Sequence, residues 1–139
     1  MEEIKALEEI EKIVSMGIIG IDDVLEKVSS KVLSKTLVDA KKKYLVVKND
    51  VGKYLQELGQ ESKEINIFVK TFNEMYTNLS LLNGNDSKIV KMLIEGTNKG
   101  ILNLEMILNK ELEDEKVKKF ATELLDVLEF QIKEWKKYL

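Results

Sequence analysis

The chain has 139 residues, of which 44% are hydrophobic and 34% are charged, and its formal net charge is −3. It contains no proline, cysteine or histidine, and all 22 of its basic residues are lysine. These absences exclude disulfides, thiolate chemistry, Ser-His-Asp triads and zinc sites built from Cys or His. An acidic chain without arginine also lacks the field and the guanidinium fork that attract nucleic acid, so no nucleic-acid partner is expected.

The first residues carry acidic side chains, whereas a secretory signal or a mitochondrial presequence is basic. The longest apolar run near the N-terminus covers residues 16–21, which is far short of the roughly 20 residues that span a bilayer. We therefore expect no transmembrane segment and a cytoplasmic location.

Apolar residues recur at three- and four-residue steps through 2–28, which predicts a first helix with one buried face. Ser29 and Ser30 interrupt the pattern and supply a helix N-cap. The same periodicity then resumes and predicts a second helix that continues to residue 58, with Gly59 as the residue that ends it.

Residues 59–85 are less regular, and we interpret them as a partly helical crossover. Its aromatic residues Phe68, Phe72 and Tyr76 keep helical spacing, which favours a place in the core, with docking of a partner peptide as the alternative. A third helix is predicted from about 86 to 108. A final helix follows the polar stretch 109–114 and buries a stripe that includes Trp135.

Four helices of roughly 23–28 residues would each be about 35–42 Å long, the length of a four-helix bundle. Short links force helices 1 and 2, and helices 3 and 4, to be antiparallel neighbours, while a crossover as long as a helix lets helix 3 begin at the far end. The sequence thus predicts an all-α fold in one domain, 1–139, whose helices run up-down-down-up.

The two hairpins also resemble each other. At an offset of 80 the first helices align apolar residues and pair Gly20 with Gly100, and at an offset of 84 the second helices pair Tyr44 with Leu128 and 53–55 with 137–139. This indicates two pseudo-repeats, 2–58 and 86–139.

The run 94–100, Ile-Glu-Gly-Thr-Asn-Lys-Gly, and the acidic turn that begins at Leu112 resemble the second hairpin of uncharacterised bacterial ferritin-like domains. The resemblance implies a ferritin-like four-helix bundle, a superfamily whose oxidases hold two metals with two Glu and two Glu-x-x-His motifs. Because the chain has no histidine, the resemblance carries over the fold and not the di-metal site.

An all-carboxylate site for magnesium, calcium or manganese is the remaining metal hypothesis. Its candidate ligands are Glu95, Glu105, Glu123 and Asp126, with Asp22, Asp23 and Glu26 on the first helix. Most of these acids flank the apolar stripes instead of occupying them, which favours a solvated surface.

Gly17, Gly20, Gly96 and Gly100 fall in the middle of two predicted helices, where each glycine costs up to ~1 kcal/mol relative to alanine. We interpret them as sites where helices 1 and 3 pack closely; the alternative is space for a small ligand or a metal.

The favoured function is therefore that of a non-enzymatic bundle without a cofactor. Such a protein would act through contacts with an unknown protein partner or with itself as a homodimer or larger homo-oligomer. The alternative is a divergent, carboxylate-only metal-binding protein of ferritin-like type.

Overall fold

The computed structural model describes residues 2–77 and 79–139, and the described residues form helices, turns and loops only. The four long helices are α1 (Glu2–Leu25), α2 (Lys31–Glu57), α4 (Asp86–Leu108) and α5 (Glu115–Trp135). The shorter ones are α3 (Val69–Met75) and the 3-10 turns Ile65–Phe68, Leu79–Leu82 and Lys136–Tyr138. The prediction of an all-α fold with a partly helical crossover is confirmed.

Local chemistry sets most helix ends. The Ser30 hydroxyl accepts a hydrogen bond from the Leu33 N–H at 3.1 Å and caps α2, as the sequence predicts. Asp114 caps α5 in the same way. Gly59 follows α2 with φ +78, the left-handed conformation that glycine adopts most easily. The first helix ends at Leu25, three residues earlier than expected, because the chain turns back towards α2 there.

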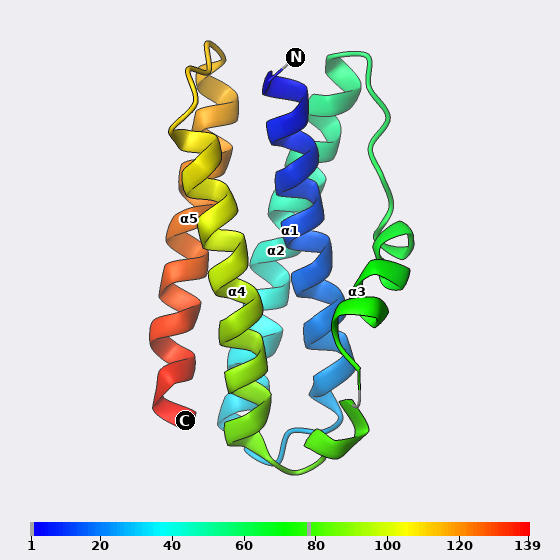
Figure 1. The fold of residues 1–139 in the computed structure, drawn as a ribbon, viewed down its shortest axis with the longest axis vertical. Helices are drawn as coiled ribbons and strands as arrows, with labels where there is room; N and C mark the ends of the chain where they lie inside the picture. The colour runs from blue at the N-terminus through cyan, green and yellow to red at the C-terminus, as the bar shows by residue number, and fades with distance from the viewer. Residues whose placement is uncertain (1, 78) are drawn as a thin grey trace.

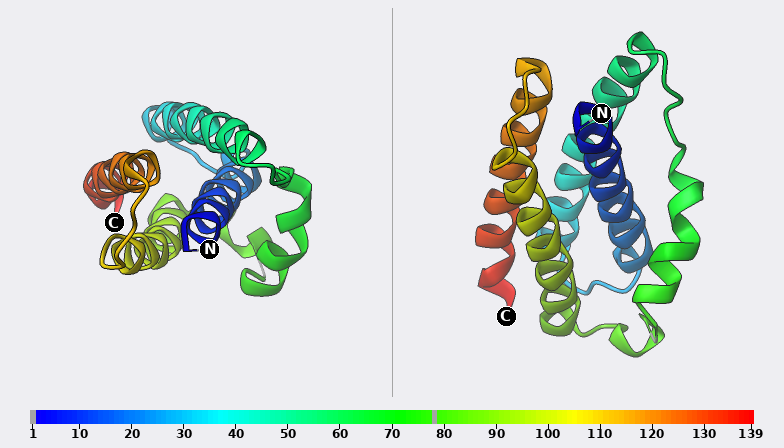
Figure 2. Two further views of the ribbon diagram at one scale, coloured as in Figure 1. Left: turned by 90° about the horizontal axis from the view of Figure 1, so that it is seen from above. Right: turned by 45° about the horizontal axis from the view of Figure 1, so that its top comes forward.

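The long helices lie side by side (Figure 1). α1 and α5 run in one direction, α2 and α4 run in the other, and the crossover returns along the length of the bundle. Viewed from above, α1 lies between α2 and α4, and the crossover packs on the outside of α1 (Figure 2). The two hairpins, α1–α2 and α4–α5, therefore pack against each other: α1 contacts both α4 and α5, and α2 contacts α5.

One apolar core fills the bundle. Its buried side chains come from all four long helices and include Leu7, Ile10, Leu37, Leu104 and Leu124, all with no exposed surface. A separate small cluster joins the crossover to α1 and consists of Ile19, Phe68 and Phe72. The placement of Phe68 and Phe72 confirms their prediction as core residues.

Polar contacts lock the end of the bundle where α1 meets α4. Both oxygens of the Asp86 carboxylate accept backbone N–H groups of the α1–α2 loop, from Ser29 at 2.8 Å and from Ser30 at 2.9 Å. The Gly84 N–H donates to the Lys27 carbonyl at 2.8 Å. The N-terminal end of α4 is thus hydrogen-bonded to the loop that joins α1 and α2.

The opposite end is held by Tyr54 and Asp114, from α2 and the start of α5. The Tyr54 hydroxyl donates to the Asp114 carboxylate, and Lys116 lies 4.4 Å from the centre of the Tyr54 ring. This hydrogen bond lowers the pKa of Asp114 and raises that of Tyr54. Across the described part of the chain, no helix is both long enough and apolar enough to cross a membrane.

Candidate functional site

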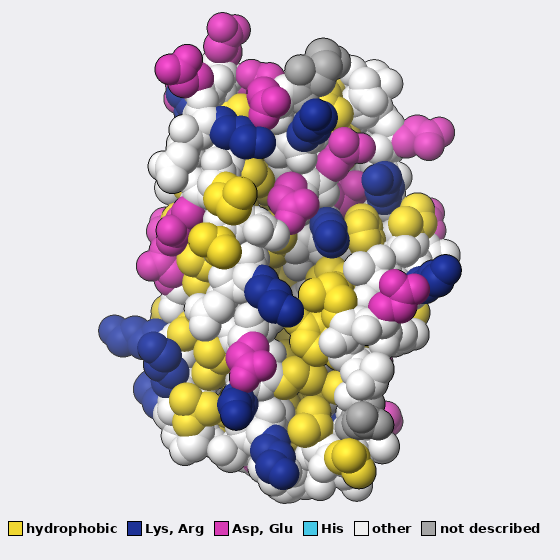
Figure 3. All heavy atoms as spheres, in the orientation of Figure 1, with side chains coloured by type: hydrophobic (Ala, Val, Ile, Leu, Met, Phe, Trp, Pro, Cys, Tyr) yellow, Lys and Arg dark blue, Asp and Glu magenta, His cyan; other side chains and the backbone are white. Residues whose placement is uncertain are grey.

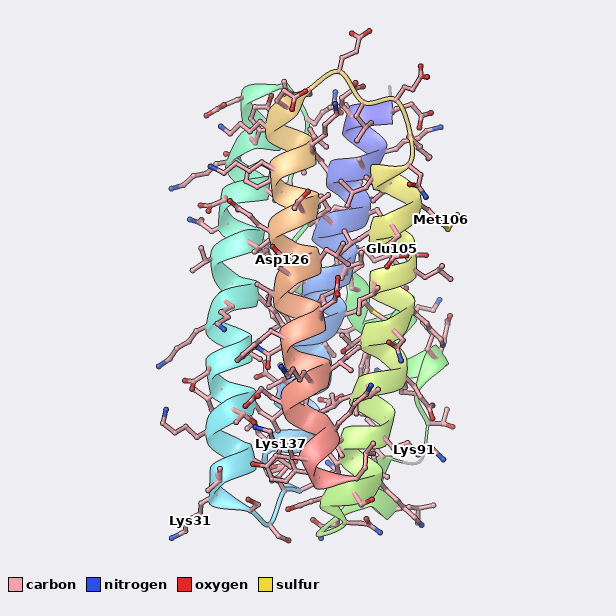
Figure 4. All side chains as sticks on the ribbon, turned by 90° about the vertical axis from the view of Figure 1, so that its left-hand side faces the viewer. Lys31, Lys91, Glu105, Met106, Asp126 and Lys137 are labelled. Carbon is pink, nitrogen blue, oxygen red and sulfur yellow. The ribbon has the colours of Figure 1, made fainter. Side chains whose placement is uncertain are left out.

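The four acids predicted as metal ligands all lie on exposed positions, Glu95 and Glu105 on α4 and Glu123 and Asp126 on α5. Figure 4 labels one from each of these two helices, Glu105 and Asp126. Glu123 forms an ion pair with Lys119 at 3.8 Å on its own helix. These acids occupy the outer surface of the bundle and not its centre.

The acids on the first helix are not gathered either. Asp22 pairs with Lys41 of α2 at 2.7 Å, and Glu26 lies 3.7 Å from the Lys27 ammonium. Within residues 2–77 and 79–139, no group of three or more acids is close enough to hold a metal ion. Among the described residues, the predicted ligands therefore do not form a convergent site, and three of them, Asp22, Glu26 and Glu123, form ion pairs with lysine.

At the level of Gly20 and Gly100 the bundle centre is filled by apolar side chains. A Cβ atom on Gly100 would lie 3.2 Å from Ile13 and 3.3 Å from Leu128, both closer than ordinary contacts. Gly100 thus lies at the close approach of α1 and α4 that the sequence suggests, through Ile13 of α1, and a Cβ atom on Gly20 of α1 would make an ordinary contact at 3.9 Å with Leu93 of α4.

The other three glycines make room for aromatic rings from elsewhere in the fold, which is a different reason from the expected helix crossing. A Cβ atom on Gly17 would lie 2.9 Å from the Tyr44 ring of α2. On Gly96 it would lie 2.7 Å from the Tyr76 hydroxyl of the crossover, and Gly20 faces the Phe72 ring in a similar way. Close packing is thus real at these positions, but the tightest contacts are with rings of α2 and the crossover.

The same glycines also line a pocket between α1, α3 and α4 with a volume of about 170 Å³. Figure 3 shows hydrophobic side chains gathered between α4 and α3 on this face of the molecule. Met16 of α1, Met92 of α4 and Met75 of α3 contribute flexible apolar walls. The two interpretations of the glycines, close packing and space for a ligand, therefore apply to one and the same region.

Polar groups lie on the outer side of this pocket. The Asn103 amide donates to the Glu9 carboxylate at 2.9 Å and joins α4 to α1. Lys99 lies 5.9 Å from the centre of the Tyr76 ring, and both line the pocket together with Lys12. Partial burial, with the nearby Glu95 charge, raises the pKa of Tyr76, so its hydroxyl stays protonated at neutral pH.

The deep side of the pocket is formed by residues from the far helices, Tyr44 of α2 and Leu128 and Trp135 of α5. Tyr44 and Trp135 are almost completely buried, and burial strongly raises the pKa of the Tyr44 hydroxyl. The Trp135 indole N–H has no hydrogen-bond partner among the described residues. A buried donor without a partner is rare in native proteins.

A buried carboxylate that the sequence does not reveal holds the crossover in place. Glu11 of α1 has no exposed surface and accepts hydrogen bonds from the Ser62 hydroxyl at 2.6 Å and the Lys63 N–H at 3.0 Å. Gly52 of α2 makes room for Ser62, because a Cβ atom there would lie 2.7 Å from the Ser62 hydroxyl oxygen. The only sequence signal is an acid directly beside the buried stripe.

Comparisons with known proteins found no match to a family model, to a curated protein or to a solved structure. The geometry offers a bundle centre with apolar packing at Gly20 and Gly100, a pocket lined mainly by apolar side chains, and predicted metal ligands that lie on exposed positions.

Proposed function

We propose that this protein is a non-enzymatic, ferritin-like helical bundle without a di-metal centre, and that it acts by binding other molecules. The observation that carries the proposal is the apolar packing at Gly20 and Gly100, where Phe72, Ile13 and Leu128 stand. A ferritin-like oxidase needs carboxylates and imidazoles pointing into the bundle. At the level of Gly20 and Gly100 the interior positions are taken by apolar side chains, which cannot bind metal.

The ferritin-like part of the proposal rests on topology. The helix directions in Figure 1 and the long crossover between α2 and α4 are those of an up-down-down-up bundle. The two-repeat interpretation is supported by the second helices, since the N-caps Ser30 and Asp114 are separated by the same offset of 84 as the aligned core residues. Tyr44 and Leu128, which pair at this offset, are both buried.

The binding surface in this proposal includes the outer face of α2. Val38, Leu45 and Val46 are large apolar residues on that face, and Val46 is 61% exposed. Their spacing puts them on one side of the helix, where a protein partner or a second copy of the chain would cover them. Sedimentation velocity from micromolar to submillimolar concentration tests self-association, which Val46→Lys should weaken by at least tenfold. A chain that stays monomeric throughout would leave a different protein as the partner.

The metal content decides between this proposal and its alternative, the carboxylate-only metal protein. We expect elemental analysis of protein purified without chelator to find substoichiometric iron and manganese. Near-stoichiometric metal, together with oxygen consumption when ferrous iron is added, would overturn the proposal. In that case Glu95→Gln and Glu123→Gln should each abolish any rise in melting temperature on metal addition. Glu105→Gln and Asp126→Gln test the other two candidate ligands in the same way.

A further inference from the structure

The pocket between α1, α3 and α4 is an apolar recess that is partly open to solvent. Its volume is about 170 Å³, and most of its lining is apolar. Three of the wall residues, Met16, Met75 and Met92, are half-buried or exposed, so a molecule from solution can reach them. Small-molecule sites combine such a recess with a few polar groups that fix the orientation of the ligand. The polar groups at the mouth therefore decide what this recess can bind.

Two lysines lie at the mouth of the pocket. Lys12 and Lys99 both line it and are both exposed, and a lysine in such a place lays its stem on apolar surface while its ammonium stays in water. Neither lysine forms an ion pair with an acid among the described residues. Glu9, the acid in the lining, already accepts a hydrogen bond from the Asn103 amide. The mouth thus offers cations that lack a carboxylate partner.

Tyr76 places a further donor beside Lys99. Its hydroxyl lies against the α4 backbone at Gly96, where a Cβ atom would be 2.7 Å away, and the Lys99 ammonium is 5.9 Å from the centre of its ring. An ammonium and a phenol can both donate to one carboxylate. Glu95 is close enough to act on Tyr76 and so opposes an anion there, but it does not line the pocket. A cationic ligand would therefore find no unengaged acid in the wall, whereas an anion finds donors.

We propose that this pocket binds a medium-chain carboxylate, with the hydrocarbon chain in the apolar recess and the carboxylate at the mouth beside Lys12, Lys99 and Tyr76. An engineered cavity of about 150 Å³ holds benzene, so about 170 Å³ takes a chain of roughly six to eight carbon atoms. Flexible methionine walls adapt to such a chain. Because the pocket is open, the charged end keeps part of its hydration and avoids the cost of burying a charge.

Methionine methyl groups report this binding directly. In protein labelled with ¹³C at the methionine methyl groups, Met16, Met75 and Met92 report from the pocket wall. Met106, an exposed residue of α4 outside the pocket, is the internal control (Figure 4). The probes are octanoate, hexanoate and octylammonium. We expect octanoate to shift the three pocket signals in a saturable way and to leave Met106 unchanged.

The relative affinities of the probes test the two ends of the ligand separately. Octanoate should bind about tenfold more tightly than hexanoate, because two more methylene groups leave water. It should also bind about fivefold more tightly than octylammonium, which has the same chain and the opposite charge, because exposed ion pairs have effects of this size.

Single-charge variants locate the carboxylate. Lys12→Gln and Lys99→Gln should each weaken octanoate binding by about two- to fivefold. Lys5→Gln and Lys88→Gln are the matched controls, because they remove the same charge from exposed positions of the same two helices outside the pocket, and they should leave the affinity nearly unchanged. Glu95→Gln removes the opposing charge and should strengthen octanoate binding by about twofold.

The proposal fails if the three pocket signals do not move with millimolar octanoate, or if Met106 moves as much as they do. It fails equally if octylammonium binds as tightly as octanoate, or if Lys12→Gln and Lys99→Gln behave like their matched controls. The site is separate from the outer face of α2, so these outcomes leave the test of self-association unaffected.

Discussion

Replacing Glu11 by methionine tests whether a buried carboxylate stabilises the whole bundle or only the attachment of the crossover. Methionine has a similar volume and no charge, so the substitution leaves little void. It removes two hydrogen bonds to an ionised acceptor, from Ser62 and Lys63, each of which contributes about 1.5–3 kcal/mol. It also removes the cost of burying a charge, and replacing buried ions by apolar groups is often neutral or stabilising by about 1–4 kcal/mol.

These opposing effects act on different equilibria. In global unfolding, the gain from removing a buried charge largely offsets the lost hydrogen bonds, so we expect the unfolding free energy to change by less than about 2 kcal/mol. In local opening of the crossover, Ser62 and Lys63 leave the side chain at position 11 while α1 stays folded, so we expect the two lost hydrogen bonds to dominate. Lys63 is exposed and Ser62 half-buried, so both donors reach water readily. We expect exchange of the Lys63 amide to accelerate by about 100-fold or more.

Urea denaturation measures the first quantity, and residue-resolved amide hydrogen exchange measures the second. Glu11→Gln is the matched control, because its amide oxygen can still accept one of the two bonds, and its Lys63 exchange should fall between wild type and Glu11→Met. Lys48 also holds this segment, through a hydrogen bond from its ammonium to the Lys63 carbonyl at 2.7 Å. A wild-type exchange rate for the Lys63 amide in Glu11→Met would refute the reasoning.

Three further predictions concern single contacts. Gly17→Ala gains about 1 kcal/mol of helix propensity but pushes a Cβ atom against the buried Tyr44 ring, so we expect urea denaturation to show a net loss of about 1 kcal/mol in unfolding free energy. In a Tyr44→Leu background, the same Gly17→Ala change should raise the unfolding free energy instead. Tyr54→Phe should raise the pKa of Asp114, followed by NMR titration of its carboxyl carbon. The folded pKa of Asp114 lies below its unfolded value of about 3.9, so ionised Asp114 contributes its full stabilisation above pH ~3.9 and loses it as the pH falls through the folded pKa. In Tyr54→Phe this loss of stability in acid should be smaller. An unchanged Asp114 pKa would contradict the hydrogen bond from Tyr54 as the cause of the lowered pKa. Asp86→Ala should cost about 1–3 kcal/mol, because two backbone N–H groups of the α1–α2 loop lose their acceptor, and Asp86→Asn should cost less.

The ends of the helices were predictable because their signals are local. A serine or aspartate N-cap, as at Ser30 and Asp114, satisfies N–H groups within three residues of itself. A glycine such as Gly59 ends a helix because of its own backbone freedom. No distant residue is needed for either effect, so the sequence alone contains the information.

The partners of the mid-helix glycines were not predictable in the same way. Periodicity shows that Gly17 and Gly96 lie near a buried face, but it cannot show which side chain arrives there. The structure brings Tyr44 to the first and Tyr76 to the second, from helices far away in the sequence. The packing interpretation was therefore right about tightness and wrong about the partner at Gly17 and Gly96, while Gly20 meets Leu93 of α4 as well as the Phe72 ring.

By itself, the sequence determined the helical class, the helix boundaries to within a few residues and the absence of thiol and imidazole chemistry, because these depend on residue type and local spacing. Only the tertiary structure decided that Glu11 is buried and that the buried Trp135 N–H has no hydrogen-bond partner among the described residues. Burial and hydrogen bonding of a side chain depend on which segments the chain brings against it. For Glu11 that segment is the crossover, 51 and 52 residues away in the sequence, and no local pattern records so distant a contact.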